Sequence, residues 1–86
     1  MRTVYKYRIP HPGEQSTELI HSNPKPVLVG QDPNGIFCVW LEVDSDISMS
    51  KKTLEVFGTG HPLPAGALHC GSFATGPFVW HVYLHG

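Results

Sequence analysis

The segment with the most distinctive chemistry is Phe57–Pro64, in which Gly58 and Gly60 flank Thr59 and precede His61. Two glycines let a backbone turn expose consecutive N–H groups, and such a concave turn can hold an anionic oxygen. The Thr59 hydroxyl and the His61 ring, which titrates near neutral pH, would add further donors. No helix N-terminus is expected to follow, so the turn would lack the helix dipole that strengthens many phosphate sites. Two interpretations therefore stay open. The segment is either a phosphate-binding turn or a rigid exit from a strand.

A nucleotide held at this turn would also need a cation for its phosphates and a flat ring for its base. Tyr7 and Arg8 supply both residue types side by side near the start of the chain. Tyr5 and Trp80 offer further rings, and a stacked ring contributes roughly 1–3 kcal/mol per base in nucleic-acid systems. The predicted ligand-binding residues are therefore Gly58, Thr59, Gly60, His61, Tyr7 and Arg8.

Histidines and cysteines could hold a metal or act as nucleophiles. His69 stands beside Cys70, with His61 and His81 in adjoining segments, but the spacing matches no paired zinc-ligand pattern. No serine lies in a G-x-S-x-G motif, and Cys38 lies in an apolar run that would raise the pKa of its thiol. The sequence therefore predicts no metal site, no cofactor and no catalytic residue. Both cysteines are expected to be small core residues rather than partners in a disulfide.

Length and composition limit the classes of protein that the chain can belong to. Its 86 residues predict one domain, 1–86, and the net charge of −1 excludes the global basic field of many nucleic-acid-binding proteins. The longest apolar run, Ile36–Leu41, is far shorter than the roughly 18–20 residues of a membrane-spanning helix. Nine glycines and eight prolines are typical of a β-rich protein with many turns.

Apolar and polar residues alternate with a period of two in several short segments, which predicts strands. The expected strands are Thr3–Ile9, Thr17–His21, Val27–Gln31, Ile36–Val43, Thr53–Thr59, Leu68–Ala74 and Pro77–Leu84. Asp32–Gly35 has the residue order of a type I turn, and Thr75-Gly76 predicts a second hairpin. The polar stretch Asp44–Lys52 is expected to be a loop with room for one helical turn.

Two of these segments, Ile36–Val43 and Pro77–Leu84, are apolar on both faces. Such strands are typical of the middle of a sheet, so Trp40 and Trp80 are expected to be largely buried. No stretch of ten or more residues has the apolar spacing of a helix. The predicted fold is all-β (or β-rich α+β), a small antiparallel barrel or sandwich of six to seven short strands.

Four segments, taken in order, resemble a family of short uncharacterised phage and bacterial proteins: Lys6–Pro10, Cys38–Trp40, Phe57–Pro64 and Trp80–Tyr83. That family shares a K-Y-x-[IL] start, a G-T-G-H-P-[IL]-P loop and a W-H-V-[FY] terminus, so the resemblance spans nearly the whole chain. The chain departs from it at Asp44–Lys52, where members usually carry more basic residues. The resemblance supplies no catalytic residues. It implies a compact accessory protein that acts in the cytoplasm of a bacterial host.

Three functions fit that context, and none of them makes the chain an enzyme. The first is an antagonist of a bacterial defence system, anti-CRISPR-like, which binds a host protein effector; about 800 Å² on one partner is enough for a stable interface. The second is a binder that sequesters a nucleotide immune signal through the Gly58–His61 loop. The third is a structural or accessory phage protein, and a homo-oligomer is compatible with each. The sequence favours the first, because a protein-binding face requires no special loop chemistry.

Overall fold

Residues 1–86 are all described by the computed structural model, which contains seven β-strands and no helix, and hence no helix that could span a membrane. The strands are β1 (Arg2–Arg8), β2 (Gln15–His21), β3 (Lys25–Gln31), β4 (Phe37–Asp44), β5 (Met49–Gly58), β6 (Leu68–Thr75) and β7 (Phe78–His85). The all-β prediction is confirmed, and every expected strand is present. The loop predicted over Asp44–Lys52 is too long, because β5 begins at Met49 and the β4–β5 turn contains no helical turn.

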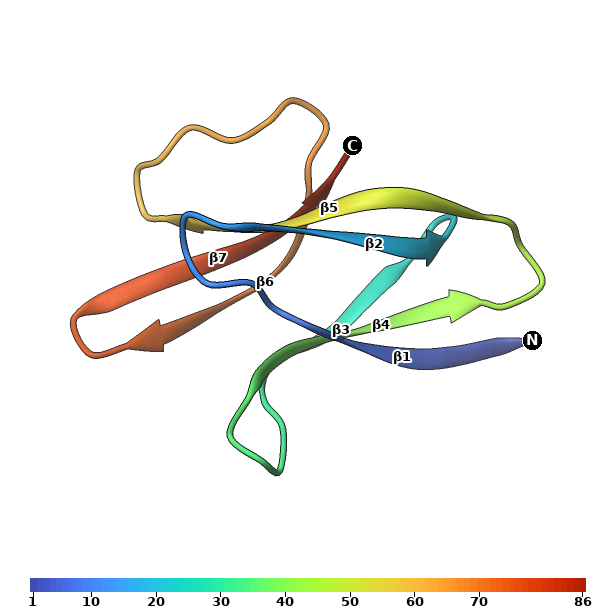
Figure 1. Ribbon diagram of the computed structural model, residues 1–86, viewed down its shortest axis with the longest axis horizontal. Coiled ribbons are helices and arrows are strands. Elements are labelled where there is room, and N and C mark those ends of the chain that lie inside the picture. The colour runs from blue at the N-terminus through green and yellow to red at the C-terminus, as the bar shows by residue number, and fades with distance from the viewer.

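The seven strands form two antiparallel sheets. Sheet A has the order β1-β4-β3 and sheet B has the order β2-β5-β7-β6. The two sheets contact each other along β3 and β6, and no ladder of hydrogen bonds joins them, so the fold is a sandwich and not a closed barrel. Figure 1 shows the start of β1 and the β4–β5 turn at the right-hand end and the β6–β7 turn at the left-hand end.

The core lies between the sheets and is built from alternate residues of their central strands. Along β4, Val39, Leu41 and Val43 are fully buried, whereas Trp40 and Glu42 point to the opposite face and are only half-buried. The buried cluster consists of Ile9, Ile20, Val39, Leu41, Val43, Leu54, Val56, Cys70, Val82 and Leu84. Ten buried residues make a small core, so close packing between the sheets is important for stability.

A β-bulge in β6 brings the two sheets together at one edge. His69 pairs with Tyr83 and Gly71 with Val82, which leaves Cys70 as the extra residue that turns into the core. Gly71 has φ +150°, and a Cβ at this position would lie 2.6 Å from Cγ2 of Val29 in β3. Only glycine fits here, because a methyl group would push β3 away from β6.

The β3–β4 turn has the geometry predicted from Asp32–Gly35. The Gly35 amide donates to the Asp32 carbonyl at 2.9 Å, and Gly35 has φ +78°. Oδ1 of Asp32 accepts hydrogen bonds from the amides of Asn34 and Ile36, and Nζ of Lys6 lies 3.1 Å from Oδ2. The Ile36 amide above all, and then Lys6, hold the pKa of the buried Asp32 carboxyl below its ordinary value. The turn thereby ties β1 to the β3–β4 hairpin.

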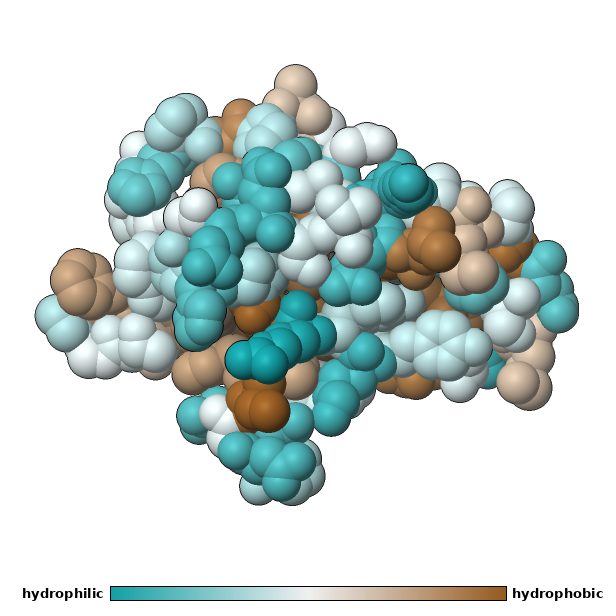
Figure 2. All heavy atoms as spheres, viewed as in Figure 1, coloured by the Kyte–Doolittle hydropathy of each residue, from teal (hydrophilic) through white to brown (hydrophobic).

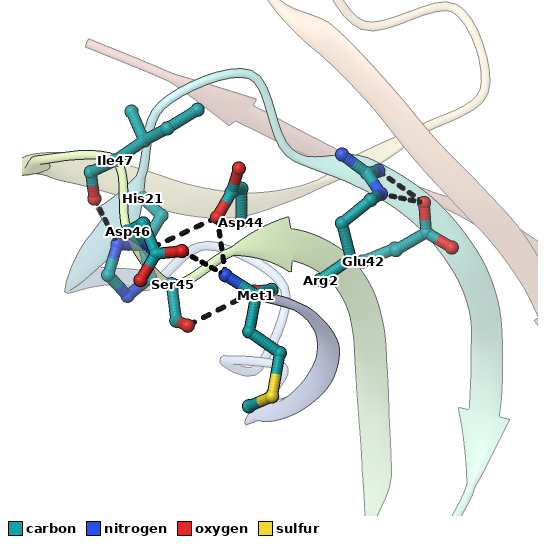
Figure 3. Close-up of polar contacts among 8 residues, drawn as sticks. All are labelled: Met1, Arg2, His21, Glu42, Asp44, Ser45, Asp46 and Ile47. Atoms are coloured by element: carbon teal, nitrogen blue, oxygen red, sulfur yellow. Dashed lines mark hydrogen bonds and ion pairs between the residues drawn. The ribbon is translucent and has the colours of Figure 1, made fainter.

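Polar contacts fasten the start of the edge strand β1 to the end of β4 (Figure 3). The amino group of Met1 donates to Oδ1 of Asp44 at 3.0 Å and also contacts Asp46, and Arg2 pairs with Glu42. These groups are mostly exposed, so salt screens their attraction. They fix where β1 begins.

Candidate functional site

The Gly58–His61 turn follows directly after β5 and uses much of its own hydrogen-bonding capacity. The His61 amide donates to the Gly58 carbonyl at 3.2 Å, and Gly60 has φ +89°, which is typical of a type II turn. Nδ1 of His61 accepts the Gly58 amide at 3.2 Å, so the ring lies over the glycine. A Cβ at Gly58 would lie 3.0 Å from this ring, which explains the need for glycine there. The Gly58 amide is therefore engaged by the His61 ring rather than free to bind an anion.

The Thr59 hydroxyl belongs to a chain of hydrogen bonds on the outer face of sheet B. Its Oγ1 lies 2.9 Å from Nε2 of His81, Nδ1 of His81 lies 2.7 Å from Oγ of Ser72, and that hydroxyl lies 3.2 Å from Nε2 of His69. Cys70, next to His69, faces the core instead, so this histidine pair gains no thiolate ligand. No group of three or more histidine, cysteine, aspartate or glutamate residues is placed to hold a metal ion.

Tyr7 and Arg8 do not join the Gly58–His61 turn, because neither lines the hollow that Gly58, Thr59 and His61 share. Tyr7 is half-buried and packs against the core, and this burial raises the pKa of its hydroxyl. Its ring is therefore a packing group rather than an exposed platform for a base. The six predicted ligand-binding residues do not form one site: Gly58, Thr59 and His61 line one hollow, and Arg8 lines another.

Arg8 instead lines a pocket at one end of the sandwich, which we call the end pocket. Its volume is about 480 Å³, within the roughly 300–1,000 Å³ typical of small-molecule sites. Its lining comes from the end of β1 and the β1–β2 loop, from the β3–β4 turn and the start of β4, and from strands β6 and β7: Arg8, Ile9, Pro10, His11, Pro12, Gly35, Ile36, Phe37, Phe73, Thr75 and Trp80. Sequence reasoning identified Arg8 and Trp80 separately but missed Phe37 and Phe73, because no local pattern links these segments.

A second surface is the outer face of sheet A, which no other element covers. Cross-strand pairing places Trp40 between Lys6 and Leu28, and places Glu42 between Val4 and Lys25. We call Val4, Lys6, Lys25, Leu28 and Trp40 the Trp40 face. Leu28 and Val4 are 55% and 45% exposed, so the face presents apolar side chains to solvent.

The Trp40 face carries more positive than negative charge, because Lys6 and Lys25 lie on it with one carboxylate, Glu42, beside them. Lys6 pairs with the buried Asp32 carboxylate, whereas Lys25 makes no ion pair. On the opposite side of the molecule, Figure 2 shows mainly teal and white side chains along β2 and β5, which is typical of a hydrated surface. Sheet B also exposes single apolar side chains, such as Leu19, but the Trp40 face combines exposed apolar side chains with a tryptophan and two lysines, which is the composition of a contact surface.

The prediction that both tryptophans are largely buried is confirmed, although neither Trp40 nor Trp80 is fully buried. Both lie on central strands as predicted, but sheet B covers one face of β4 only, and Trp80 borders the open end pocket. The cysteines are both buried and free. Burial raises the pKa of the Cys70 thiol to about 11 and also raises that of Cys38, so neither has the properties of a nucleophile.

Comparison with known proteins gives a single positive finding. Residues 1–86, the whole chain, match a domain described as "Domain of unknown function (DUF7352)". No curated protein and no solved structure matches the chain.

Proposed function

We propose a function for this chain, which belongs to the DUF7352 family. It is a non-catalytic binding protein that uses the Trp40 face to occupy a surface of another protein. The observation that carries the proposal is the uncovered sheet face with a half-buried tryptophan at its centre and exposed apolar neighbours. Tryptophan is enriched among the residues that dominate binding energy at protein interfaces.

The charges of the face define the chemistry of the partner. Lys25 carries a charge that no residue of the chain neutralises by an ion pair, and Lys6 is half exposed. An acidic surface with an apolar centre would complement both features, and complementary charge accelerates association and selects the partner. A typical interface buries about 800 Å² of each partner, which is roughly one seventh of the 5263 Å² surface of the chain. A partner could therefore bind one face of the sandwich without covering the rest of the molecule.

The identity of the partner is the second part of the proposal. We propose a protein effector of a bacterial defence system, which the protein antagonises by stoichiometric binding. This part is supported by the resemblance of the sequence to short phage and bacterial proteins, and by the absence of any need for catalytic groups in such a task. The nucleotide-binding alternative at the Gly58–His61 loop receives less support, because His61 and Thr59 are engaged within the chain.

The experiment expresses the protein in bacterial strains that each carry one defence system, CRISPR systems included, and measures the plating efficiency of a phage that the system restricts. We expect the protein to restore plating in at least one strain. Leu28→Glu should abolish that rescue by placing a charge on the Trp40 face. Leu19→Glu is the matched control, because Leu19 is also 55% exposed but lies on β2 of sheet B.

Two results would count against the proposal. Equal rescue by both variants would show that the Trp40 face is not the binding surface. Absence of rescue across strains that represent the known classes of defence system would remove the defence effector as the partner.

A further inference from the structure

The end pocket shares no residue with the Trp40 face, although the two adjoin at Arg8, which lies two residues after Lys6 on β1. The chemistry of the pocket lining is one-sided. Its lining includes three large aromatic rings, one arginine and one histidine, and no aspartate or glutamate. We infer that the end pocket binds a planar aromatic anion about the size of a mononucleotide, with the ring against the aromatic side chains and the anionic group at Arg8.

The aromatic side chains form a preorganised apolar floor. Phe37 of sheet A and Phe73 of sheet B stack with ring centroids 4.4 Å apart and an interplanar angle of 26°. Nε1 of Trp80 donates to Oγ1 of Thr75 at 3.0 Å, which holds the indole in one orientation. Because these rings are fixed before a ligand arrives, a flat molecule loses little free energy to reordering when it stacks on them.

Arg8 gives the pocket its preference for an anion. Its guanidinium makes no ion pair in the chain, and it can donate two parallel hydrogen bonds to a phosphate or carboxylate. His11 lines the pocket beside it and offers a ring nitrogen. The carboxylates of Glu14 and Glu18 line a shallower neighbouring hollow that shares Arg8 and His11, not the end pocket itself. An anion in the end pocket therefore meets only cationic or neutral groups.

The volume of the pocket limits the size of the ligand. At about 480 Å³ it lies in the lower part of the range for small-molecule sites, which suits one ring system with one anionic group rather than a dinucleotide. Aromatic carboxylates, like nucleotides, combine a flat ring with an anionic group, so the probes below include both classes of ligand.

The side-chain indole resonances of the ¹⁵N-labelled protein provide a direct readout. The chain has two tryptophans, and Trp40→Phe assigns the remaining indole signal to Trp80. The probes are nucleoside 5′-monophosphates, the matching nucleosides, indole-3-carboxylate and inorganic phosphate. We expect the Trp80 signal to shift saturably with a planar anion, while the Trp40 signal of the unsubstituted protein stays in place.

The variants test the role of the arginine. Arg8→Gln should weaken binding by about tenfold or more, because it removes charge-assisted hydrogen bonds worth roughly 1.5–3 kcal/mol. Lys25→Gln, which removes another cation without an ion pair from sheet A, should leave the affinity within about twofold of the original, because exposed charges at a distance are screened. The backbone spectrum of each variant shows that the fold is retained.

Tighter binding of a monophosphate than of its nucleoside supports the inference and identifies a nucleotide, whereas tighter binding of the carboxylate supports it and identifies that class. The inference is overturned if no planar anion shifts the Trp80 signal at millimolar concentration, if the neutral nucleoside binds equally well, or if Arg8→Gln binds like the original chain.

Discussion

The bulge at Gly71 allows a sharp test of how the two sheets are held together. Gly71→Ala places a Cβ 2.6 Å from Cγ2 and 3.0 Å from Cβ of Val29, at a φ of +150° that side chains rarely adopt. Gly30→Ala is the matched control: Gly30 lies on β3, next to Val29, and a Cβ there would meet no atom within 4 Å. The same chemical change thus meets a crowded site in one variant and open space in the other.

The expected loss of stability has two parts. Overpacking against Val29 costs about 1–3 kcal/mol, because β3 must move away from β6 to relieve the contact. The unfavourable backbone conformation adds roughly 1–3 kcal/mol. An 86-residue domain has about 4–13 kcal/mol of stability in total, so Gly71→Ala removes a large fraction of it. Gly30→Ala should be neutral or stabilising by up to about 1 kcal/mol, because alanine lowers the entropy of the unfolded chain.

Urea unfolding followed by tryptophan fluorescence measures these free energies. We expect the urea midpoint of Gly71→Ala to fall well below that of Gly30→Ala. In thermal unfolding, the melting temperature of Gly71→Ala should be lower by roughly 10 °C or more. Adding Val29→Ala to Gly71→Ala should recover the part of the overpacking cost that comes from Cγ2 of Val29, but not the backbone part. Equal midpoints for the two glycine variants would refute the account of the β3–β6 contact.

Three further predictions concern the turn, the acidic group and the thiols. Gly60→Ala should lower the free energy of unfolding by roughly 1–2 kcal/mol in the same urea assay, because its φ of +89° strains any other residue. The pKa of Asp32 is lower in the folded chain than its ordinary value of 3.8, so its charge stabilises the fold above that pH and the stabilisation is lost as the pH falls through the folded pKa. Melting temperatures from pH 7 to pH 2 should therefore fall less steeply for Asp32→Asn, and an unchanged slope would contradict this. Cys38 and Cys70 should react with Ellman's reagent only in denaturant, since burial raises the pKa of both thiols, and rapid reaction of the folded protein would show that one of them is accessible.

The strands could be predicted from the sequence because each has a local cause. Alternation of apolar residues marks the face that meets the core, and Asp32–Gly35 carries its own turn chemistry. The start of β5 was missed because Met49–Lys52 pairs with β2 alone, beyond the reach of β7, and is held by backbone hydrogen bonds rather than by burial. The polar residues there have the composition of a loop, although they extend β5 and pair with β2 alone.

The candidate sites were harder to predict, because they depend on which sheet each strand joins. Tyr7 and Arg8 are neighbours in sequence, yet one packs against the core and the other lines the end pocket. β4 carries apolar residues on both faces up to Leu41, and only the arrangement of the sheets shows that sheet B leaves the Trp40 face open. Assembly of the end pocket from four segments leaves no spacing in the sequence that could reveal it.

Stoichiometric binding through the Trp40 face is tested most directly by titrating the effector of the defence system that the plating experiment identifies. The residual activity of the effector is measured against increasing amounts of the protein, of Leu28→Glu and of Leu19→Glu. We expect a linear loss of activity that ends at a fixed molar ratio for the protein and for Leu19→Glu, and no loss with Leu28→Glu. Complete inhibition far below equimolar amounts, or full inhibition by Leu28→Glu, would contradict stoichiometric binding through the Trp40 face.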